Sequence, residues 1–183
     1  MVSTETPICD FGAIAPSFKL KGVDGKEHTL EELKGEKGTL VMFICNHCPY
    51  VKAIIHRIIR DASDLKELGV NTVAIMSNNP DEYEEDSFEN MQKISEKLNF
   101  PFHYLIDETQ SMAKAYGAVC TPDFFGYNAE LSLQYRGRLD ASRKETAPDA
   151  SRDLFEAMKQ VAETGNGPTE QIPSIGCSIK WLD

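Results

Sequence analysis

The stretch that decides the fold runs from residue 39 to residue 49 and reads TLVMFICNHCP. Residues 39–44 form a short apolar run rich in β-formers, which predicts a buried strand. From residue 50 to about 68, apolar residues return at helical spacing with charged residues between them, which predicts an amphipathic helix. Cys45 and Cys48 therefore lie where a strand meets a helix. Two thiols three positions apart can form a disulfide, and a helix N-terminus stabilises a thiolate, so this junction has the outline of a redox site.

The chain has 183 residues, of which 41% are hydrophobic and 26% charged, as expected for one soluble globular domain. We predict a single domain over residues 1–183, with a core from about 12 to 164 and an irregular C-terminal tail over 165–183. The formal net charge of −10 argues against broad nucleic-acid binding and against docking on anionic membranes. No stretch approaches the roughly 18 apolar residues of a membrane helix. The first residues lack the basic region and apolar core of a secretory signal, so the expected location is the cytoplasm.

Beyond the first motif, the pattern alternates strands with helices. The acidic run 81–86 is interpreted as a solvated loop and helix start, and Thr146-Ala147-Pro148-Asp149 as the cap of the last helix. The element order implies parallel βαβ crossovers first and an antiparallel hairpin at the end, hence an α/β fold whose sheet is covered by helices on both faces. The other predicted elements lie at 18–21 and 26–30 around Asp24-Gly25, then at 70–77, 88–98, 103–106, 111–116, 122–127 and 133–136.

Six stretches spread over nearly the whole chain carry a family resemblance. They are 15–18 (APSF), 43–51 (FICNHCPYV), 107–110 (DETQ), 116–125 (YGAVCTPDFF), 137–140 (GRLD) and 176–181 (GCSIKW). Together they resemble the thioredoxin-like superfamily, and within it the alkyl hydroperoxide reductase/thiol-specific antioxidant (peroxiredoxin) branch. The resemblance implies a thioredoxin-like three-layer α/β/α sandwich with a mixed central sheet and an N-terminal β-hairpin extension. It also implies that Thr121-Pro122 is the cis-proline bond facing the cysteines, with the backbone of Thr121 open to pair with an extended thiol substrate.

Two departures from the peroxiredoxin pattern affect the expected chemistry. Peroxiredoxins use a Thr-x-x-Cys pattern and an arginine that binds the peroxide. Here Met42 stands three positions before Cys45, and Cys45 stands three before Cys48, while the neighbourhood of Cys120-Thr121-Pro122 contains no arginine. Without a donor that polarises the O–O bond, fast peroxide reduction loses its main electrostatic aid. The sequence therefore favours thiol–disulfide exchange.

Either cysteine of the pair can be the attacking thiol. In one register Cys45 is the exposed nucleophile and Cys48 the buried resolving thiol. In the other register Cys48 occupies the helix N-cap and is itself the activated thiol. Pro49 favours the second register, because proline suits the first helical position and clashes with the preceding turn further in. We expect Cys48 to have the lower pKa and Cys45 to be its disulfide partner.

Other residues are candidates for supporting roles. His47 lies inside the motif, where it can stabilise a neighbouring thiolate and make the disulfide more oxidising than that of thioredoxin; a solvent-facing loop histidine is the other interpretation. Cys120, beside Thr121-Pro122, is either a mixed partner of the attacking thiol or a small buried filler. Cys177 is either a third redox thiol that folds back to resolve the adduct or a packed residue. Cys9 is interpreted as incidental.

The leading functional hypothesis is an enzyme, a cytoplasmic thiol–disulfide oxidoreductase of antioxidant type that works through the Cys-x-x-Cys pair. It needs no metal and no organic cofactor. Its expected partners are a thioredoxin- or glutathione-like thiol donor and a disulfide or peroxide substrate, with no nucleic acid and no membrane; the sequence sets no oligomeric state.

A weak thiol peroxidase is the first alternative. A metal-binding protein or a non-catalytic thioredoxin-fold interaction protein is the second. The chain has no second Cys-x-x-Cys and no paired histidines, and we assign surface roles to His28, His56 and His103. We therefore predict no metal site.

Overall fold

The computed structural model describes residues 2–183, so Met1, where the predicted domain begins, lies outside the described residues. The strand predicted at residues 39–44 forms as β4 (Gly38–Phe43), and all of its residues are buried. Because side chains alternate along a strand, Leu40 and Met42 face one hydrophobic cluster while Val41 and Phe43 face another. β4 is therefore an inner strand with a core on each face.

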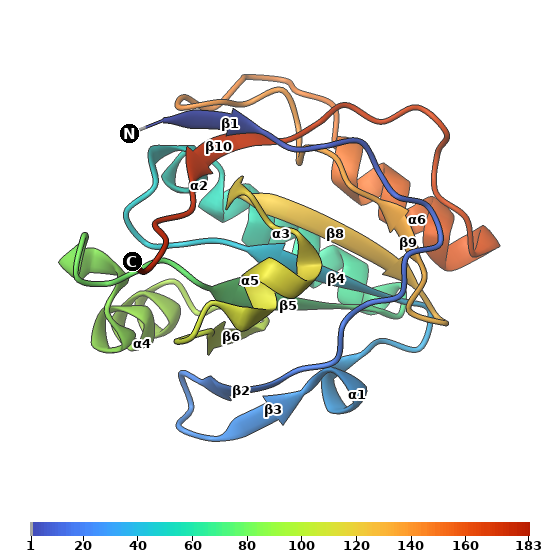
Figure 1. Ribbon diagram of the computed structural model, residues 1–183. Helices are drawn as coiled ribbons and strands as arrows, with labels where there is room; N and C mark the ends of the chain where they lie inside the picture. The colour runs from blue at the N-terminus through green and yellow to red at the C-terminus, as the bar shows by residue number, and fades with distance from the viewer. Residues whose placement is uncertain (1) are drawn as a thin grey trace.

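β4 lies inside a mixed sheet of seven strands in the order β3-β2-β6-β5-β4-β8-β9 (Figure 1). The strands β4, β5 and β6 are parallel neighbours, and β8 is antiparallel to β4. Both edges are antiparallel hairpins, β2–β3 and β8–β9, which confirms the two predicted hairpins. The bounds of these strands are β2 Lys19–Gly22, β3 Glu27–Thr29, β5 Val70–Met76, β6 His103–Ile106, β8 Asp123–Asn128 and β9 Leu133–Tyr135.

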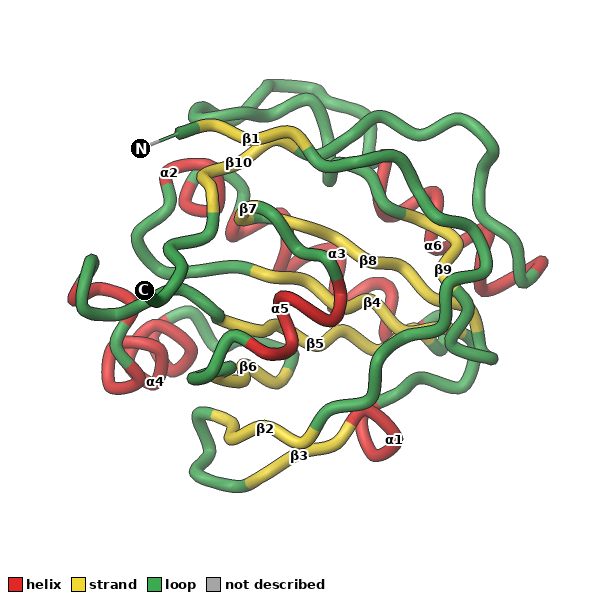
Figure 2. The backbone as a smooth tube through the Cα atoms, in the orientation of Figure 1, coloured by secondary structure: helices red, strands yellow, loops and turns green. Residues whose placement is uncertain are grey.

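Helices cover both faces of this sheet (Figure 2). Helices α2, α3, α4 and α6 contribute to the hydrophobic cluster that contains Leu40 and Met42, whereas α1 and α5 contribute to the cluster that contains Val41 and Phe43. The predicted three-layer α/β/α sandwich with a mixed sheet and an N-terminal hairpin is confirmed. The bounds are α1 Leu30–Leu33, α2 Pro49–Lys52, α3 Ile55–Glu67, the 3-10 helix η1 Glu84–Asp86, α4 Phe88–Lys97, α5 Ser111–Tyr116 and α6 Asp153–Thr164.

A second, three-stranded antiparallel sheet has the order β1-β10-β7. It consists of β1 (Ser3–Glu5), β10 (Ile175–Ser178) and β7 (Cys120–Thr121). The prediction of an irregular tail over 165–183 is therefore wrong at β10. The tail becomes a strand there because its backbone groups find partners on β1 and β7, which lie far away in the sequence. Local residue patterns do not reveal such pairing.

Thr146 takes part in two differences between predicted and observed helices. The helix predicted from residue 50 to about 68 is divided into α2 and α3, and Ile54 at the break has φ −122° and ψ 3°. The Thr146 hydroxyl donates to the carbonyl oxygen of Ala53, so a carbonyl at the break has a partner outside the helix. Thr146 is thus not part of a cap for α6, which begins at Asp153 with Arg152 as its N-cap. Within residues 2–183, no helix has both the length and the apolar character that crossing a membrane requires.

Candidate active site

Three cysteine thiols meet at the beginning of α2. Cys48 is the N-cap residue and Pro49 the first residue of this helix, in the register that Pro49 favours. The Sγ atom of Cys48 lies 3.1 Å from the Sγ atom of Cys177 on β10. A hydrogen bond also joins it to Cys45, which follows β4. All five cysteines are free thiols, so this is the reduced form of a three-thiol cluster.

The three thiols differ in pKa because of the hydrogen bonds that join them. The hydrogen bond from Cys45, with further ones from Thr121 and Cys177, lowers the pKa of Cys48 to about 5, although burial acts in the opposite direction. Burial, the hydrogen bond to Cys48 and the charge of Asp86 raise the pKa of Cys45 well above its ordinary value. Burial and the hydrogen bond to Cys48 raise the pKa of Cys177 to about 12. At neutral pH the negative charge of the cluster therefore lies on Cys48.

Asp86 holds the loop between the two cysteines of the motif. Its Oδ1 atom accepts the N–H of Asn46 at 2.8 Å and the N–H of His47 at 3.1 Å, and its Oδ2 atom lies 2.5 Å from Nδ1 of His47. The Asp86 side chain is fully buried. The interpretation of residues 81–86 as a solvated loop is therefore wrong for Asp86, because these donors replace water around its carboxylate.

His47 faces Cys45 and Asp86. Its Nδ1 atom lies 3.5 Å from Sγ of Cys45, and its ring is stacked on Tyr83 with the ring centroids 3.8 Å apart. The ring is buried, so the interpretation of His47 as a solvent-facing loop histidine is wrong. Its Nε2 atom is buried and has no hydrogen-bond partner among residues 2–183. A role of His47 in the redox chemistry stays a prediction, and the contact it makes is with Cys45.

Thr121 contacts both cysteines of the motif. The Thr121-Pro122 bond is cis, as the family resemblance implies. The Oγ1 atom of Thr121 lies 3.4 Å from Sγ of Cys45, and its carbonyl oxygen lies 3.2 Å from Sγ of Cys48. A carbonyl accepts only from a protonated thiol, so this second contact opposes ionisation of Cys48. Cys120 is buried with its Sγ 3.6 Å from the carbonyl oxygen of Pro122, an environment that suits a small filler.

Asn78, Tyr83 and Asp86 belong to the site, and none of the three is predicted from the sequence. Asn78 follows β5 and donates from Nδ2 to Oδ2 of Asp86 at 3.3 Å. A signal was available for Asn78. Parallel neighbours such as β4 and β5 end at the same edge of a sheet, so the residues that follow them meet there. No comparable signal exists for Tyr83 and Asp86, which lie in a run of charged residues.

Two groups of side chains have the composition of a metal site: Cys45 with His47 and Asp86, and Asp24 with His28 and His103. In each group the candidate ligand atoms lie within 4.8 Å of one another. Asp24 is hydrogen-bonded to His28 in one group and Asp86 to His47 in the other, and we assign neither group to a metal. The surface role predicted for His28 is wrong, because His28 is buried between Asp24, 2.8 Å away, and Glu32, 3.0 Å away.

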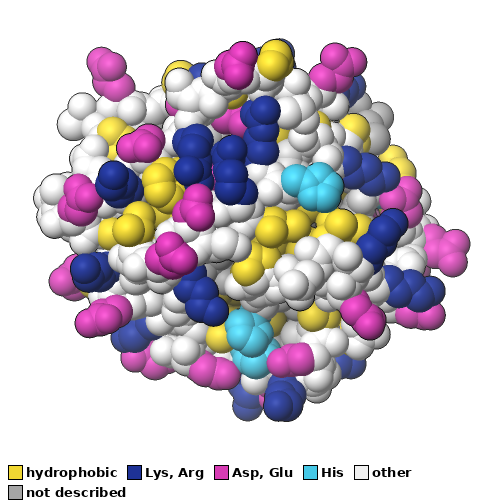
Figure 3. All heavy atoms as spheres, turned by 180° about the vertical axis from the view of Figure 1, so that it is seen from behind, with side chains coloured by type: hydrophobic (Ala, Val, Ile, Leu, Met, Phe, Trp, Pro, Cys, Tyr) yellow, Lys and Arg dark blue, Asp and Glu magenta, His cyan; other side chains and the backbone are white. Residues whose placement is uncertain are grey.

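A groove of about 290 Å³ reaches the sulfur cluster at Cys45. Its walls include the apolar side chains of Ile55, Ile94 and Phe100, and the exposed lysine Lys52 also lines it. The face of the molecule seen in Figure 3 carries hydrophobic patches with basic side chains beside them. The groove brings a small molecule beside Cys45, the one cysteine among its lining residues.

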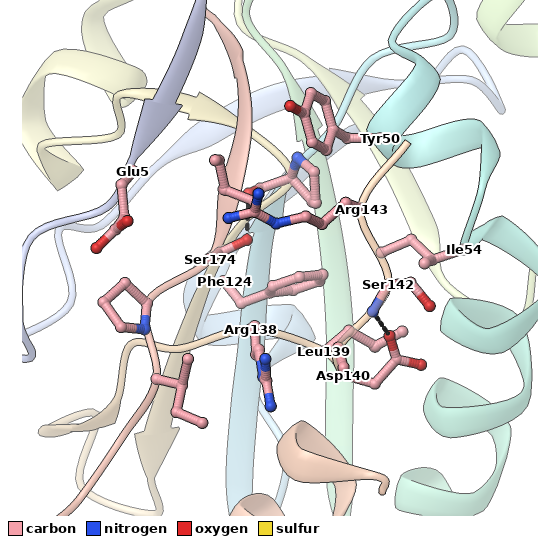
Figure 4. A pocket seen from close by; sticks show the side chains of 15 residues that line it. Glu5, Tyr50, Ile54, Phe124, Arg138, Leu139, Asp140, Ser142, Arg143 and Ser174 are labelled. Atoms are coloured by element: carbon pink, nitrogen blue, oxygen red, sulfur yellow. Dashed lines mark hydrogen bonds between the residues drawn. The ribbon is translucent and has the colours of Figure 1, made fainter. Parts of the chain in front are cut away.

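A smaller cavity of about 120 Å³ lies beside Pro122 (Figure 4). Tyr50, Arg143 and Ser174 are among its lining residues, and Figure 4 also shows Ser142, whose N–H donates to Asp140 at 2.7 Å. No cysteine lines this cavity.

The fold and the thiol cluster define a protein of the thioredoxin-like class. The model of the AhpC/TSA family matches residues 11–141, which is most of the chain. The chain belongs to the AhpC/TSA family. This membership supports a thioredoxin-like redox function, of the thiol oxidoreductase or peroxidase kind. A comparison with curated proteins gives no match.

Solved structures support the same class. The chain is similar to an uncharacterized conserved protein from Geobacillus kaustophilus, with 46% identity over 100% of this chain and 97% of that chain and a TM-score of 0.93. It is also similar to a hypothetical protein from Sinorhizobium meliloti 1021, with 38% identity over 99% of each chain and a TM-score of 0.92. The thioredoxin domain of a thiol-disulfide oxidoreductase from Bacteroides vulgatus has 15% identity over 83% of this chain and 97% of its own, with a TM-score of 0.64. That last likeness shows the fold alone.

Proposed function

We propose that the protein is a thiol–disulfide oxidoreductase in which Cys48 is the attacking thiol and Cys45 its resolving partner. The observation that carries the proposal is the position of Cys48 at the N-cap of α2, 3.1 Å from the Cys177 thiol, where hydrogen bonds lower its pKa to about 5 while the pKa of Cys45 is raised. A thiol that is ionised at neutral pH supplies the nucleophile of disulfide exchange. Membership of the AhpC/TSA family supports thiol chemistry at this site.

The exchange consists of two substitutions at sulfur. The Cys48 thiolate attacks one sulfur of the substrate disulfide, which forms a mixed disulfide and releases the other half as a thiolate. Cys45 then gives up its proton to the released thiolate, and its sulfur attacks Sγ of Cys48 and releases the second half of the substrate. The protein gains a Cys45–Cys48 disulfide, and the substrate gains two electrons and, from water or the protein, two protons.

The charge on Cys48 determines when Cys45 can take part in the second step. While Cys48 is a thiolate, both its charge and its hydrogen bond raise the pKa of Cys45. Formation of the mixed disulfide removes that charge, so the pKa of Cys45 falls when its thiolate is needed. The same pair thus provides first a stabilised nucleophile and then a resolving thiol.

A thiol donor of the thioredoxin or glutathione type reduces the protein disulfide and completes the cycle. The proposal involves no metal and no organic cofactor. It includes a cytoplasmic location and an antioxidant role; five cysteines cannot all pair within one chain, and a close pair in a reducing compartment is more often catalytic than structural.

An ultraviolet titration of the thiolate tests the proposal without requiring a reagent to reach buried sulfur. The thiolate absorbance of the reduced protein is followed with pH and compared with that of Cys48→Ser. We expect a titration near pH 5 in the wild type that is absent from the variant. Cys9 serves as an internal reference, because burial raises its pKa to about 11. A Cys48 that titrates like an ordinary cysteine, or a Cys45 that ionises first, would overturn the proposal.

A weak thiol peroxidase is the second candidate function, favoured by the AhpC/TSA family match. In that reaction the Cys48 thiolate attacks a peroxide oxygen, giving a sulfenic acid and an alcohol or water, and a second thiol condenses with it and releases water. The side chains that hydrogen-bond to Cys48 within residues 2–183 are those of Cys45, Thr121 and Cys177, and none of them is an arginine. We therefore expect hydrogen peroxide to oxidise the protein no faster than it oxidises a free thiolate. A faster oxidation in stopped-flow measurements would make the peroxidase the leading function.

A further inference from the structure

The backbone edge that should accept an extended substrate is occupied by the chain itself. β10 pairs antiparallel with β7, and the register places Cys177 opposite Thr121 and Ser178 opposite Cys120. Thr121 is the residue whose backbone the family resemblance leaves open for a thiol substrate. β10 therefore runs where a cysteine-containing peptide would run, and its cysteine stands at the substrate position.

The sulfur of Cys177 completes this likeness to a bound substrate. Its Sγ atom is 3.1 Å from Sγ of Cys48, within the distance of a thiol hydrogen bond. A substrate peptide held on Thr121 would bring its own sulfur to the same atom. No second strand can lie between β10 and β7, because the two are already hydrogen-bonded to each other.

β10 lies so close to β7 that only glycine fits at position 176. A Cβ atom added to Gly176 would overlap the carbonyl oxygen of Thr121 and lie 2.5 Å from its carbonyl carbon. Real Cβ atoms essentially never come so close to backbone, so the strand would have to move. Glycine here permits a close backbone approach.

β10 is also held on its other edge and at both ends. β1 pairs with it along Ser3–Glu5. Before the strand, the Ser174 hydroxyl donates to the carbonyl oxygen of Pro122 at 2.9 Å. After it, the N–H of Lys180 donates to Oδ1 of Asn78 at 2.9 Å, and Nε2 of Gln110 donates to the carbonyl oxygen of Lys180 at 2.8 Å. Displacing β10 would break all of these contacts together.

The groove reaches the cluster at one thiol, since Cys45 is among its lining residues and Cys48 and Cys177 are not. The groove described above ends on Cys45 and Asn46, and no residue of β10 lines it. Its volume of about 290 Å³ is at the lower limit of ligand pockets, which are about 300–1,000 Å³. It suits a small ligand with an apolar part and excludes a folded polypeptide.

We propose that β10 permanently fills the peptide-binding edge, so that the site accepts low-molecular-weight disulfides through the groove beside Cys45 and is closed to polypeptide disulfides. This inference rests on the proposed function and names its substrate class. The chemistry is the exchange already described: the small disulfide is reduced to two thiols while two protein thiols lose two electrons and become a disulfide.

A comparison of two disulfide substrates tests the inference. The reduced full-length protein is mixed in single-turnover experiments with bis(2-hydroxyethyl) disulfide or with insulin, and the loss of protein thiols is followed by mass spectrometry. We expect oxidation by the small disulfide to be about a hundredfold faster than by insulin, because insulin requires the packed strand to leave. Equal rates would overturn the inference and leave the proposed function intact, whereas no reaction with either disulfide would overturn both.

Gly176→Ala opens the edge without removing a cysteine. We expect insulin to oxidise this variant about tenfold faster than the wild type or more, because overpacking raises the population in which β10 is displaced. Gly167→Ala is the matched control, since its added Cβ would overlap the carbonyl oxygen of Gln134 away from the thiols. An equal gain in both variants would point to general destabilisation and overturn the inference.

Ile94→Trp tests the groove independently of β10 folding. The larger side chain fills the groove, and we expect oxidation by bis(2-hydroxyethyl) disulfide to slow about tenfold. Glu96→Trp, on an exposed position of the same helix, should keep the wild-type rate. An unchanged rate in Ile94→Trp would show that the substrate enters elsewhere, which overturns the inference.

Discussion

Cys45 and Cys48 stand three residues apart and are both buried, but their pKa values are shifted in opposite directions. Cys45 is 2% exposed and Cys48 0%, so burial alone would raise both pKa values. The difference comes from their neighbours. Cys45 lies near the carboxylate of Asp86, whereas hydrogen bonds join Cys48 to the side chains of Cys45, Thr121 and Cys177. The comparison teaches that hydrogen bonds can outweigh burial at one of two buried thiols and so decide which sulfur carries the charge.

Replacing Cys48 removes one of the two compared thiols, and we expect it to have the largest effect on the rate of disulfide reduction. Cys48→Ser should slow the reduction of a small disulfide by about a thousandfold or more, because the nucleophile is lost. The measurement is the single-turnover loss of protein thiols. Cys9→Ser, at a half-buried cysteine outside the cluster, should keep the wild-type rate. Retention of most of the rate by Cys48→Ser would mean that another thiol attacks.

Replacing Cys45 tests the cause of the low pKa. Cys45→Ala removes the hydrogen bond that contributes most to it, so the pKa of Cys48 should rise from about 5 towards the ordinary value of 9.0. At neutral pH the exchange should slow by about tenfold or more, because less thiolate is present. The thiolate absorbance gives the pKa directly. Cys120→Ala is a matched control at another buried cysteine and should leave the pKa of Cys48 near 5; a low pKa in Cys45→Ala would contradict our account.

The two thiols also predict opposite effects of pH on stability. The pKa of Cys48 is lower in the folded protein than in the unfolded chain, so its contribution to stability should grow from about pH 5 to about pH 9 and be lost as the pH falls through about 5. Cys45 and Cys177 have raised pKa values, so stability should decline above about pH 9, where the unfolded chain releases their protons. Urea unfolding at a series of pH values measures this profile. In Cys48→Ser the rise between pH 5 and pH 9 should be smaller, and an identical rise would refute the assignment.

Replacing Asp86 should change the pKa of Cys45 and leave that of Cys48 unchanged. We expect this to be the smallest of the effects on the exchange reaction. Asp86→Asn removes a charge that raises the pKa of Cys45, so that pKa should fall while the pKa of Cys48 stays near 5. The buried hydrogen bonds of Asp86 also weaken, which should lower the free energy of unfolding by about 1–3 kcal/mol. Thiolate titration and urea unfolding measure the two effects. A large change at Cys48 would show that both thiols respond to the same carboxylate.

The parts of the site that the sequence predicts are local. The run at residues 39–44 predicts a buried strand, and Pro49 predicts that Cys48 is the N-cap of the next helix; both features form. They were predictable because alternation along a strand and the conformational restriction of proline act over a few residues. Thr121-Pro122 was located through the family resemblance.

The parts that the sequence does not predict depend on contacts between distant residues. Asp86 lies in an acidic run that looks solvated, and only the fold turns its carboxylate towards the N–H groups of Asn46 and His47. The strand β10 contains only four residues, and no local pattern indicates that β1 and β7 will pair with it. Folding back of Cys177 was one of two interpretations, because a sequence does not show which sulfur atoms meet.

The distance in sequence between Cys48 and Cys177 has a consequence for biosynthesis. The two residues are 129 positions apart. At a translation rate of about 5–20 residues per second, Cys177 is added about 6–26 seconds after Cys48. During that interval a nascent chain carries the thiol of Cys48 without the strand that later encloses it. Such a chain is open to mixed disulfides with other proteins, so a reducing environment at the ribosome protects the protein while it is being made.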